Sequence, residues 1–449
     1  MQYQKEIAQT EEYDVVVCGA GVAGFAAAVQ SARLGARTAL LERYGMPGGV
    51  LTVGGNNEIG LFYRGSRQII SGIGWELVQR LKVKGWADIP EFDEKYDHSQ
   101  QNVIVNGPMA AAEMDAMCME AGVELLYHHT LCDAIADKGH ICAVLAAAKP
   151  EMRMICGKYF IDATGDADLT AWSGGETHLG DGEPTQMQPG TLRFYWSGYV
   201  LSDVDKRQTE DSFRKGLETH ELERSDYWSQ EGSPYTVFAA DGNNINHIPL
   251  NGADSLSRTR AEIEGRRSVA RLAAWARHRV SGAEHIQPIA CAPEVAARES
   301  RRVVGDHVIT VEEYTQAVSY PDGVCYSYYP IDLHVHGEQT LYNISVREGA
   351  VPQLPYRALL VRGTDNLLAV GRCASGDRLA QSAFRVKASC MAMGQAAGCA
   401  AAMAADQGKT LRELSAEELC DMLKRQHAIV PEKQHIQKRA EKESEPWKA

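Results

Sequence analysis

Residues 14–43 restrict the fold of this chain more than any other stretch of its sequence. They begin with the β-branched run 15–17, continue through three glycines spaced Gly-x-Gly-x-x-Gly and an alanine-rich stretch, and end in a second apolar run at 38–41. A buried strand, a glycine turn, a helix and a second strand form the βαβ unit that binds dinucleotides. The stretch therefore predicts an α/β protein with a parallel sheet and a dinucleotide at its first turn.

Each glycine of this turn has its own predicted task. Gly19 permits the tight turn, Gly21 lets a pyrophosphate approach the backbone, and Gly24 lets the helix pack close to the strand. The N-terminus of the helix offers free N–H groups to the phosphates. Glu42 ends the second strand, where a carboxylate accepts the hydroxyls of an adenosine ribose and repels a 2′-phosphate. The turn by itself fits NAD and FAD equally.

Composition limits the partners that the chain can have. A length of 449 residues predicts two joined domains, and 44% hydrophobic with 23% charged residues is typical of a globular protein. A net charge of −13 disfavours nucleic acid as a partner. Because there is neither an apolar leader nor an apolar run of about 18 residues, we expect a cytoplasmic protein without a membrane partner.

The eleven cysteines are scattered, and no two are spaced Cys-x-x-Cys. This pattern predicts reduced, buried thiols and gives no support to a redox dithiol or a zinc site. We therefore expect no metal in this protein.

A second glycine-rich stretch, residues 44–57, follows the βαβ unit. Gly48 and Gly49 can bring backbone N–H groups against a second phosphate or a ribityl chain, and Asn56 and Asn57 can face a bound ring. The alternative is a flexible surface loop.

Further along, the pattern predicts returns to the sheet and two amphipathic helices. Residues 141–145 and 154–160 alternate like an antiparallel pair, and the second run ends in Thr164-Gly165-Asp166, an element able to return to the adenosine end. Periodicity predicts helices over 69–85 and 255–280, the latter with Ile263 facing inward.

The aromatic residues concentrate between 174 and 355, as suits a substrate-binding domain or an aromatic sheet core. We expect a discontinuous cofactor-binding domain formed by residues 1–173 and 355–412, and a mixed α+β substrate domain over 174–354. Residues 413–449 are expected to form a C-terminal helix and a charged, mobile tail.

The best acid–base candidates lie in the segment 328–336. On a regular strand Asp332, His334 and His336 share one face, and Tyr329 lies on the other. We assign proton transfer to His334 or Tyr329, against a hydrogen-bonded structural role or a metal-ligand role for the histidines. Arg298, in the charged segment 298–302, belongs either to a salt-bridge network or to an anion clamp.

The C-terminal part supplies a second set of expected cofactor contacts. Residues 365–377 form a strand running into a glycine turn, and residues 382–405 form a long helix of small residues. Such a helix either aims its N-terminus at a ring carbonyl that bears negative charge or simply packs tightly. Because contacts at both 164–166 and 371–398 suit a long, permanently bound dinucleotide, the sequence favours FAD.

Six segments together resemble the FAD-dependent oxidoreductase family that is often loosely labelled xanthan-lyase-like, a branch of the glutathione reductase-type FAD fold. These segments are residues 14–43, 48–52, 161–168, 298–302, 329–334 and 366–401. The resemblance implies a Rossmann-like FAD-binding domain, a parallel sheet with a three-stranded antiparallel addition, interleaved with the substrate domain.

The resemblance also implies which residues hold FAD. The ADP half would contact Gly19, Gly21, Ala23, Gly24, Glu42, Arg43 and Gly49, and the adenine would meet Leu131 with Gly165 close by. The turn with Gly371, Arg372 and Asp377 would hold pyrophosphate and ribityl, and Arg385 would begin the helix that points at the flavin. After Gly371-Arg372 relatives often carry a Ser-x-x-x-Glu-like stretch, whereas this chain has Cys373-Ala-Ser-Gly-Asp-Arg-Leu-Ala, so the groups near the flavin are expected to differ.

The sequence thus predicts hydride transfer between a small polar organic substrate, such as a sugar or hydroxylated ring, and flavin N5. Two alternatives stay open: a reductase of an activated C=C or C=O bond that uses an external donor such as NADH, and a non-catalytic FAD-binding subunit. No second Gly-x-Gly-x-x-Gly unit follows a strand, so the sequence predicts no dedicated NAD(P)H domain. A diffusible nicotinamide or a protein carrier stays open as the electron donor or acceptor, and a homo-oligomer stays open as well.

Overall fold

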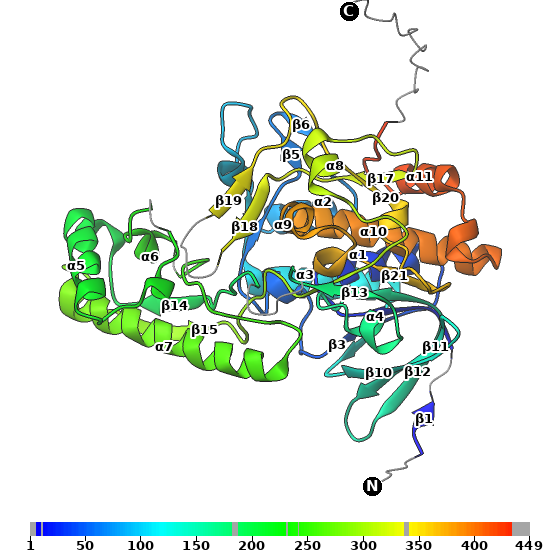
Figure 1. Ribbon diagram of the computed structural model, residues 1–449, viewed down its shortest axis with the longest axis horizontal. Helices are drawn as coiled ribbons and strands as arrows, with labels where there is room; N and C mark the ends of the chain where they lie inside the picture. The colour runs from blue at the N-terminus through cyan, green and yellow to red at the C-terminus, as the bar shows by residue number, and fades with distance from the viewer. Residues whose placement is uncertain are drawn as a thin grey trace, which may run out of the picture.

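The computed structural model describes residues 6–9, 12–181, 187–229, 232–240, 242–335 and 341–432. Its centre is a parallel sheet in the order β12-β2-β3-β9, with β21 also paired to β12 (Figure 1). The strands are β2 (Tyr13–Cys18), β3 (Thr38–Glu42), β9 (Glu124–Tyr127), β12 (Arg153–Asp162) and β21 (Leu367–Ala369). The parallel α/β sheet that the first turn predicts is confirmed.

Strand β12 serves two parts of the sheet because it is long. Its C-terminal half pairs with β2 and β21, whereas its N-terminal half pairs with β11 (His140–Ala147) and with β1 (Ala8–Gln9). Strand β10 (Thr130–Asp137) completes the antiparallel addition β10-β11-β12. Apolar residues of this addition and of one sheet face form a single buried cluster, so the three-stranded addition covers that face.

Helices cover the opposite face of the sheet. They are α1 (Val22–Arg33), α2 (Ile73–Val83), α3 (Gly107–Ala121) and α10 (Lys387–Gln407). Gly394 and Gly398 of α10 lie directly against α1: a Cβ added to either would sit 2.0 Å from the carbonyl oxygen of Ala23 or 2.2 Å from that of Ala27. The backbones of α1 and α10 are therefore in contact.

This contact predicts a loss of stability when either glycine gains a methyl group. Gly398→Ala is expected to lower the free energy of unfolding by about 1–3 kcal/mol, because overpacking outweighs the gain in helix propensity. Urea unfolding of the apoprotein measures this. Gly107→Ala is the matched control, since its Cβ would meet no atom closer than 3.6 Å. Equal stability of both variants would contradict the contact.

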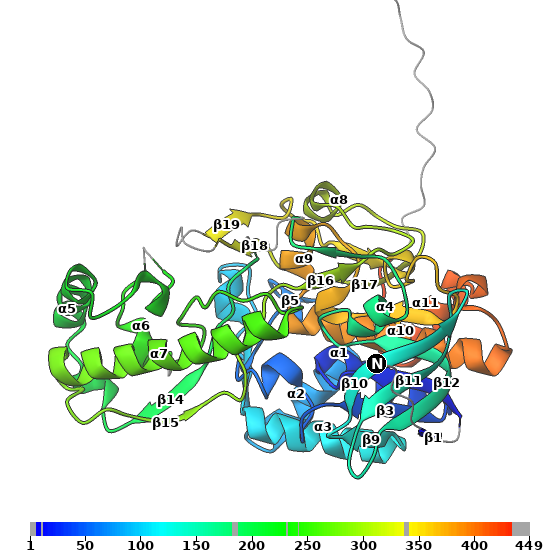
Figure 2. The ribbon, with the colours of Figure 1, turned by 60° about the horizontal axis from the view of Figure 1, so that its bottom comes forward.

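A separate lobe extends to one side of the sheet domain (Figures 1 and 2). Its buried apolar residues run from Leu192 to Ala297 and form their own cluster around Trp275 and Phe238. Its elements are β14 (Phe194–Ser197), α5 (Lys206–Glu218), α6 (Thr236–Ala239), α7 (Ser255–Arg279) and β15 (Gln287–Cys291). Helix α7 is confirmed, but the inward placement of Ile263 is wrong, because this side chain is exposed on the solvent face.

The remaining strands and helices are short, and several of their apolar residues pack in the core of α1 and α10. They are β4 (Glu58–Ile59), β5 (Tyr63–Arg64), β6 (Arg67–Gln68), β7 (Ala87–Asp88), β8 (Val103–Val105), α4 (Asp168–Trp172), β13 (Thr177–Leu179), β16 (Arg301–Val303), α8 (Val311–Gln316), β17 (Gly323–Tyr326), β18 (Ile331–His334), β19 (Leu341–Ile344), β20 (Gln353–Pro355), α9 (Arg378–Phe384) and α11 (Ala416–Arg425). The domain boundaries expected from the sequence stay a prediction.

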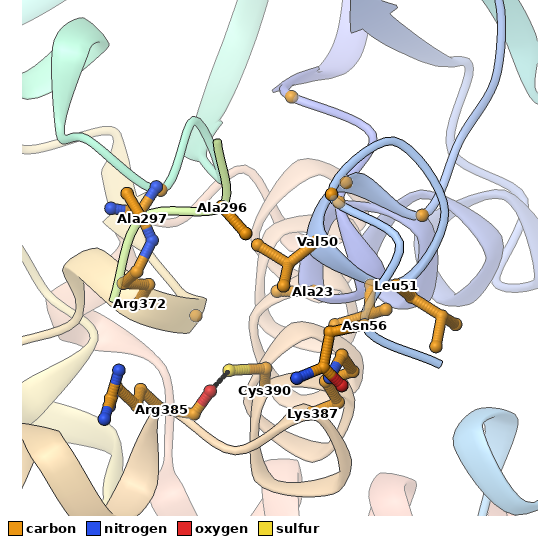
Figure 3. A pocket seen from close by; sticks show the side chains of 18 of the residues that line it. Ala23, Val50, Leu51, Asn56, Ala296, Ala297, Arg372, Arg385, Lys387 and Cys390 are labelled. Atoms are coloured by element: carbon orange, nitrogen blue, oxygen red, sulfur yellow. Dashed lines mark hydrogen bonds between the residues drawn. The ribbon is translucent and has the colours of Figure 1, made fainter. Parts of the chain in front are cut away.

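The long helix expected over 382–405 is interrupted. Helix α9 ends at Phe384, Val386 has an extended ψ of 147°, and α10 begins at Lys387. The side chains of Arg385 and Lys387 consequently lie on different sides of Cys390, as Figure 3 shows. The break places both cations in the site described below.

The thiols and the most apolar helix complete the description. Cys132, Cys142 and Cys291 are exposed, which corrects the expectation that the thiols are buried, and the structure places all eleven as free cysteines. In the described part of the chain, α10 alone has the length and hydropathy of a membrane span, and 89% of its apolar window is buried in the protein. His336 and the tail beyond 432 lie outside the described residues.

Candidate functional site

The first turn has the geometry that a pyrophosphate needs. Gly19 has a φ of +99°, and a Cβ there would lie 2.5 Å from the carbonyl oxygen of Ala163. A Cβ on Gly24 would lie 1.9 Å from the carbonyl oxygen of Gly19, so α1 packs directly on the turn. A Cβ on Gly21 would meet nothing within 4 Å, and this residue lines a cavity at the N-terminus of α1. The space in front of Gly21 is thus open to a phosphate group.

Glu42 lies in the wall of the same cavity, at the end of β3. Its carboxylate accepts the N–H groups of Ala20 at 2.9 Å and Tyr44 at 3.0 Å, which fix its orientation. Burial raises the pKa of Glu42, and these two hydrogen bonds oppose the rise. Each carboxylate oxygen keeps a further lone pair for a ribose hydroxyl. Arg43, beside it, pairs with Glu294 across the cavity rim.

The adenosine end of the cavity is completed by segments far apart in sequence. Leu131 and Gly165 line it, together with His129, one of two adjacent histidines that the sequence marks as structural or cofactor-flanking. Arg372 lies beside Gly165 and donates to Asp166 at 2.9 Å and to the hydroxyl of Ser300 at 2.7 Å. Although burial opposes ionisation, Arg372 and Arg258 lower the pKa of Asp166 to about 2.

Two predicted cofactor residues have other roles in the structure. Asp377 does not line the cavity; its carboxylate accepts the N–H groups of Ala380 and Val311 and so caps α9. Gly48 lines the cavity, but its N–H donates to the carbonyl of Ala20 at 2.7 Å and is not free for a phosphate. Gly49, Ala23 and Gly371 line the cavity at the turn as expected.

Residues 48–51 and the start of α10 line neighbouring parts of the cavity (Figure 3). Asn56 faces Lys387, whose Nζ donates to the Asn56 Oδ1 and to the carbonyl of Glu58, each at 2.8 Å. Burial lowers the pKa of Lys387 to about 8, and Arg385 and Arg193 add to the decrease. This lysine was missed, although its position two residues after Arg385 at a helix start was a usable signal.

The far end of the cavity, called the distal end below, holds most of the remaining polar groups. It is lined by Asn56, Glu58, Arg193, Asn243, Asn244, Arg298, Tyr329, Asp332, His334, Arg385 and Lys387. The predicted catalytic residues Arg298, Tyr329 and His334 therefore line the same end of the cavity. Arg298 lies in a loop, His334 in strand β18 and Tyr329 two residues before that strand. The same cavity joins them to the glycine turn at its other end.

The strand β18 presents Asp332 and His334 side by side. His334 Nε2 lies 3.5 Å from Asp332 Oδ2, and His334 Nδ1 lies 2.9 Å from Nε2 of His247. Burial lowers the pKa of His334 to about 4; Arg298 lowers it further and Asp332 opposes the decrease. His334 is therefore neutral near pH 7 and able to accept a proton.

Asp332 and Tyr329 complete this wall. Burial would raise the pKa of Asp332, but His334, Arg385 and Arg298 together lower it to about 2. Burial raises the pKa of Tyr329, and Asp332 raises it further, so this phenol stays protonated and is suited to donate a hydrogen bond.

His247 is a site residue that sequence reasoning missed. It is 4% exposed, and the ring of Trp228 stacks on it with centroids 5.6 Å apart and planes at 16°. It lies 87 positions before His334, in the lobe, so no local pattern links the two. Its hydrogen bond to Nδ1 fixes the ring of His334 and leaves Nε2 facing Asp332 and the cavity.

The observed residues fit an FAD molecule. A carboxylate for a ribose, an open glycine turn on a helix N-terminus for a pyrophosphate and a polar distal end for a ring all line one cavity. Among the described residues, no group of three or more potential ligands is placed to hold a metal ion.

Comparisons with known proteins agree with this geometry. A family model described as FAD dependent oxidoreductase matches residues 14–423. Thiamine thiazole synthase of Aeropyrum pernix is 29% identical over 170 residues, which are 35% of this chain and 56% of that protein. The enzyme of the same name from Thermotoga maritima is 25% identical over 174 residues, 36% of this chain and 62% of that protein. The match thus spans little more than half the length of these relatives.

Among solved structures, Aquifex aeolicus GidA has a TM-score of 0.46 at 14% identity, covering 89% of this chain and 65% of that one. A geranylgeranyl bacteriochlorophyll reductase-like protein of Thermoplasma acidophilum has a TM-score of 0.44 at 12% identity, covering 94% and 84%. Because the family model extends from β2 to α11, through both ends of the cavity, the chain belongs to the FAD-dependent oxidoreductases.

Proposed function

We propose that the protein transfers a hydride between a small polar organic molecule and FAD, with the substrate bound at the distal end. When bound, FAD supplies the two-electron acceptor or donor at flavin N5. The protein must then handle the proton that accompanies the hydride. The observation that carries this proposal is a neutral, buried His334 in the cavity wall with a carboxylate on one ring nitrogen and a histidine on the other.

In the oxidising direction His334 accepts the proton of a substrate hydroxyl or amine at Nε2. This requires the tautomer of His334 that carries its proton on Nδ1 and donates it to Nε2 of His247 at 2.9 Å. The resulting imidazolium is stabilised by that hydrogen bond and by Asp332, 3.5 Å from Nε2. Tyr329, held protonated, donates a hydrogen bond that orients the substrate. In the reducing direction the same groups return the proton.

The test is anaerobic mixing of the FAD-loaded protein with a panel of polar metabolites. A dehydrogenase bleaches the absorbance of oxidised flavin with a substrate alone. Bleaching by NADH without substrate, followed by reoxidation with an activated C=C or C=O compound, would instead identify a reductase. If neither substrates nor donors change the flavin absorbance, the proposal of hydride transfer by the isolated chain fails.

A further inference from the structure

The charges of the distal end are unequal. Four cationic side chains line it, those of Arg193, Arg298, Arg385 and Lys387, against the carboxylates of Glu58 and Asp332. FAD does not restore the balance there, because its pyrophosphate is assigned to the turn at Gly21, at the other end of the cavity. An excess of positive charge away from bulk water is unfavourable unless an anion binds it.

Arg298 donates its hydrogen bonds to neutral acceptors only. Its two terminal nitrogens donate to the carbonyl of Pro189 at 2.7 Å and to Oδ1 of Asn244, both neutral acceptors. In the described part of the chain no carboxylate forms an ion pair with it, whereas Arg385 lies 3.5 Å from Asp332 Oδ2. Arg385 also donates to the carbonyl oxygen of Arg298 at 3.1 Å, which brings the two like charges together.

The protonation behaviour of Arg298 agrees with this imbalance. Burial and the charge of Arg385 lower its pKa to about 9, and Asp332 only partly opposes the decrease. A guanidinium is normally charged at any physiological pH. The lowered pKa therefore means that the surroundings of Arg298 disfavour its positive charge.

Two unpartnered polar atoms point to a missing ligand in the same place. Arg193 is 7% exposed and Asn243 is 8% exposed, and both line the cavity. The Nε of Arg193 and the Oδ1 of Asn243 have no hydrogen-bond partner. Buried polar groups are nearly always satisfied in folded proteins. Because both atoms have almost no accessible surface, a bound molecule would complete their hydrogen bonds only after these side chains turn toward the cavity.

We propose that the substrate of this enzyme is a small organic carboxylate whose carboxylate group is bound by Arg298, with Arg385 beside it. This inference rests on the proposed function and narrows it, because the carbon next to the carboxylate is then held beside His334. The planar guanidinium of arginine matches a carboxylate, and a hydroxyl or amine on the adjacent carbon would serve Arg193 and Asn243.

The experiment titrates the FAD-loaded protein with benzoate and acetate, and with benzamide and acetamide as uncharged matches. Perturbation of the flavin absorbance and titration calorimetry report binding independently of turnover. The carboxylates are expected to bind about 10- to 100-fold more tightly than the amides, as for hydrogen bonds to a charged group. Sodium chloride at equal ionic strength should produce neither the change in flavin absorbance nor the heat of binding.

Variants identify the binding residue. Arg298→Met should weaken benzoate binding about 10- to 100-fold and leave benzamide unchanged, whereas Arg298→Lys should restore part of the affinity. Arg267→Met, on the exposed face of α7, is the matched control and should bind like the wild type. Thermal unfolding with FAD bound checks that each variant is folded.

These experiments distinguish a failure of the carboxylate inference from a failure of the proposed hydride transfer. If neutral polyols bleach the flavin while carboxylates neither bind nor react, hydride transfer stands and the carboxylate inference is overturned. Equal affinity for benzoate and benzamide would also overturn it, as would a change of flavin redox potential in Arg298→Met without any change in benzoate affinity. If carboxylates bind through Arg298 but nothing reduces the flavin, the carboxylate inference stands and the proposed function fails.

Discussion

FAD will no longer bind to Gly21→Asp, and its Kd is expected to rise at least about 1000-fold. A carboxylate at this position lies against the pyrophosphate, and two like charges about 4 Å apart near a protein surface repel by about 4 kcal/mol. Gly21 has an ordinary φ of −59° and its Cβ would enter open space, so the substitution leaves the fold intact. Titration of the apoprotein with FAD, followed by tryptophan fluorescence, measures the loss.

Gly21→Ala separates the effect of charge from that of volume. Its methyl group occupies part of the phosphate space without adding charge, so the increase in Kd should be about 10- to 100-fold, well below that of the aspartate. Far-ultraviolet circular dichroism of the apoproteins is the control for folding. A folded Gly21→Asp protein with wild-type affinity would show that the pyrophosphate does not lie on this turn.

His334→Gln is expected to lower the rate of flavin reduction by a substrate about 100- to 10,000-fold, the usual contribution of a general base. Glutamine fills similar space and keeps hydrogen bonding to the neighbours, but it cannot accept a proton. Single-turnover reduction under anaerobic conditions isolates this step. Unchanged FAD affinity in the variant would place the loss in chemistry and not in cofactor binding.

The pH profile carries a second signature of the same residue. His334 acts as a base only when neutral, so the reduction rate should fall as pH decreases through about 4, the lowered pKa, and stay level between pH 5 and 7. This fall in rate at low pH is the acid limb of the profile. An ordinary exposed histidine would place the acid limb near pH 6.5. An acid limb at 6.5 would be inconsistent with His334 as the base in its buried setting.

His247→Phe tests the positioning contact. The phenyl ring keeps the stack on Trp228 but removes the acceptor for Nδ1 of His334, so the rate should fall less than in His334→Gln. Because protonated His334 loses a partner, the acid limb should move to still lower pH. If the rate falls but the acid limb stays at the same pH, His247 contributes to the site through packing alone.

The cofactor end of the cavity was predictable because its pattern is local. Gly19, Gly21, Gly24 and Glu42 lie within one βαβ unit, where spacing fixes geometry, and the structure gives each glycine the predicted surroundings. Asp377 failed as a cofactor residue for a local reason as well. An aspartate before a short helix satisfies its free N–H groups, and the sequence alone does not distinguish a capping carboxylate from a binding one.

The distal end was only partly predictable because long-range packing assembles it. His334 and Tyr329 were recognisable by residue type, but their partner His247 belongs to another lobe and has no sequence signal. The break at Val386 was missed since every residue from 382 to 405 is compatible with a helix. Only the three-dimensional position of the cavity explains why Arg385 and Lys387 are turned to different walls.

The backbone contact between α1 and α10 has a consequence for how such enzymes diversify. It joins the phosphate turn to the helix that begins at Lys387, so a substitution at this contact is expected to disturb both walls of the cofactor site together. Arg193, Asn243 and Asn244 come instead from the lobe, which has its own core. Exchange of lobe residues between relatives would therefore change which molecule is oxidised or reduced without rebuilding the part that holds FAD.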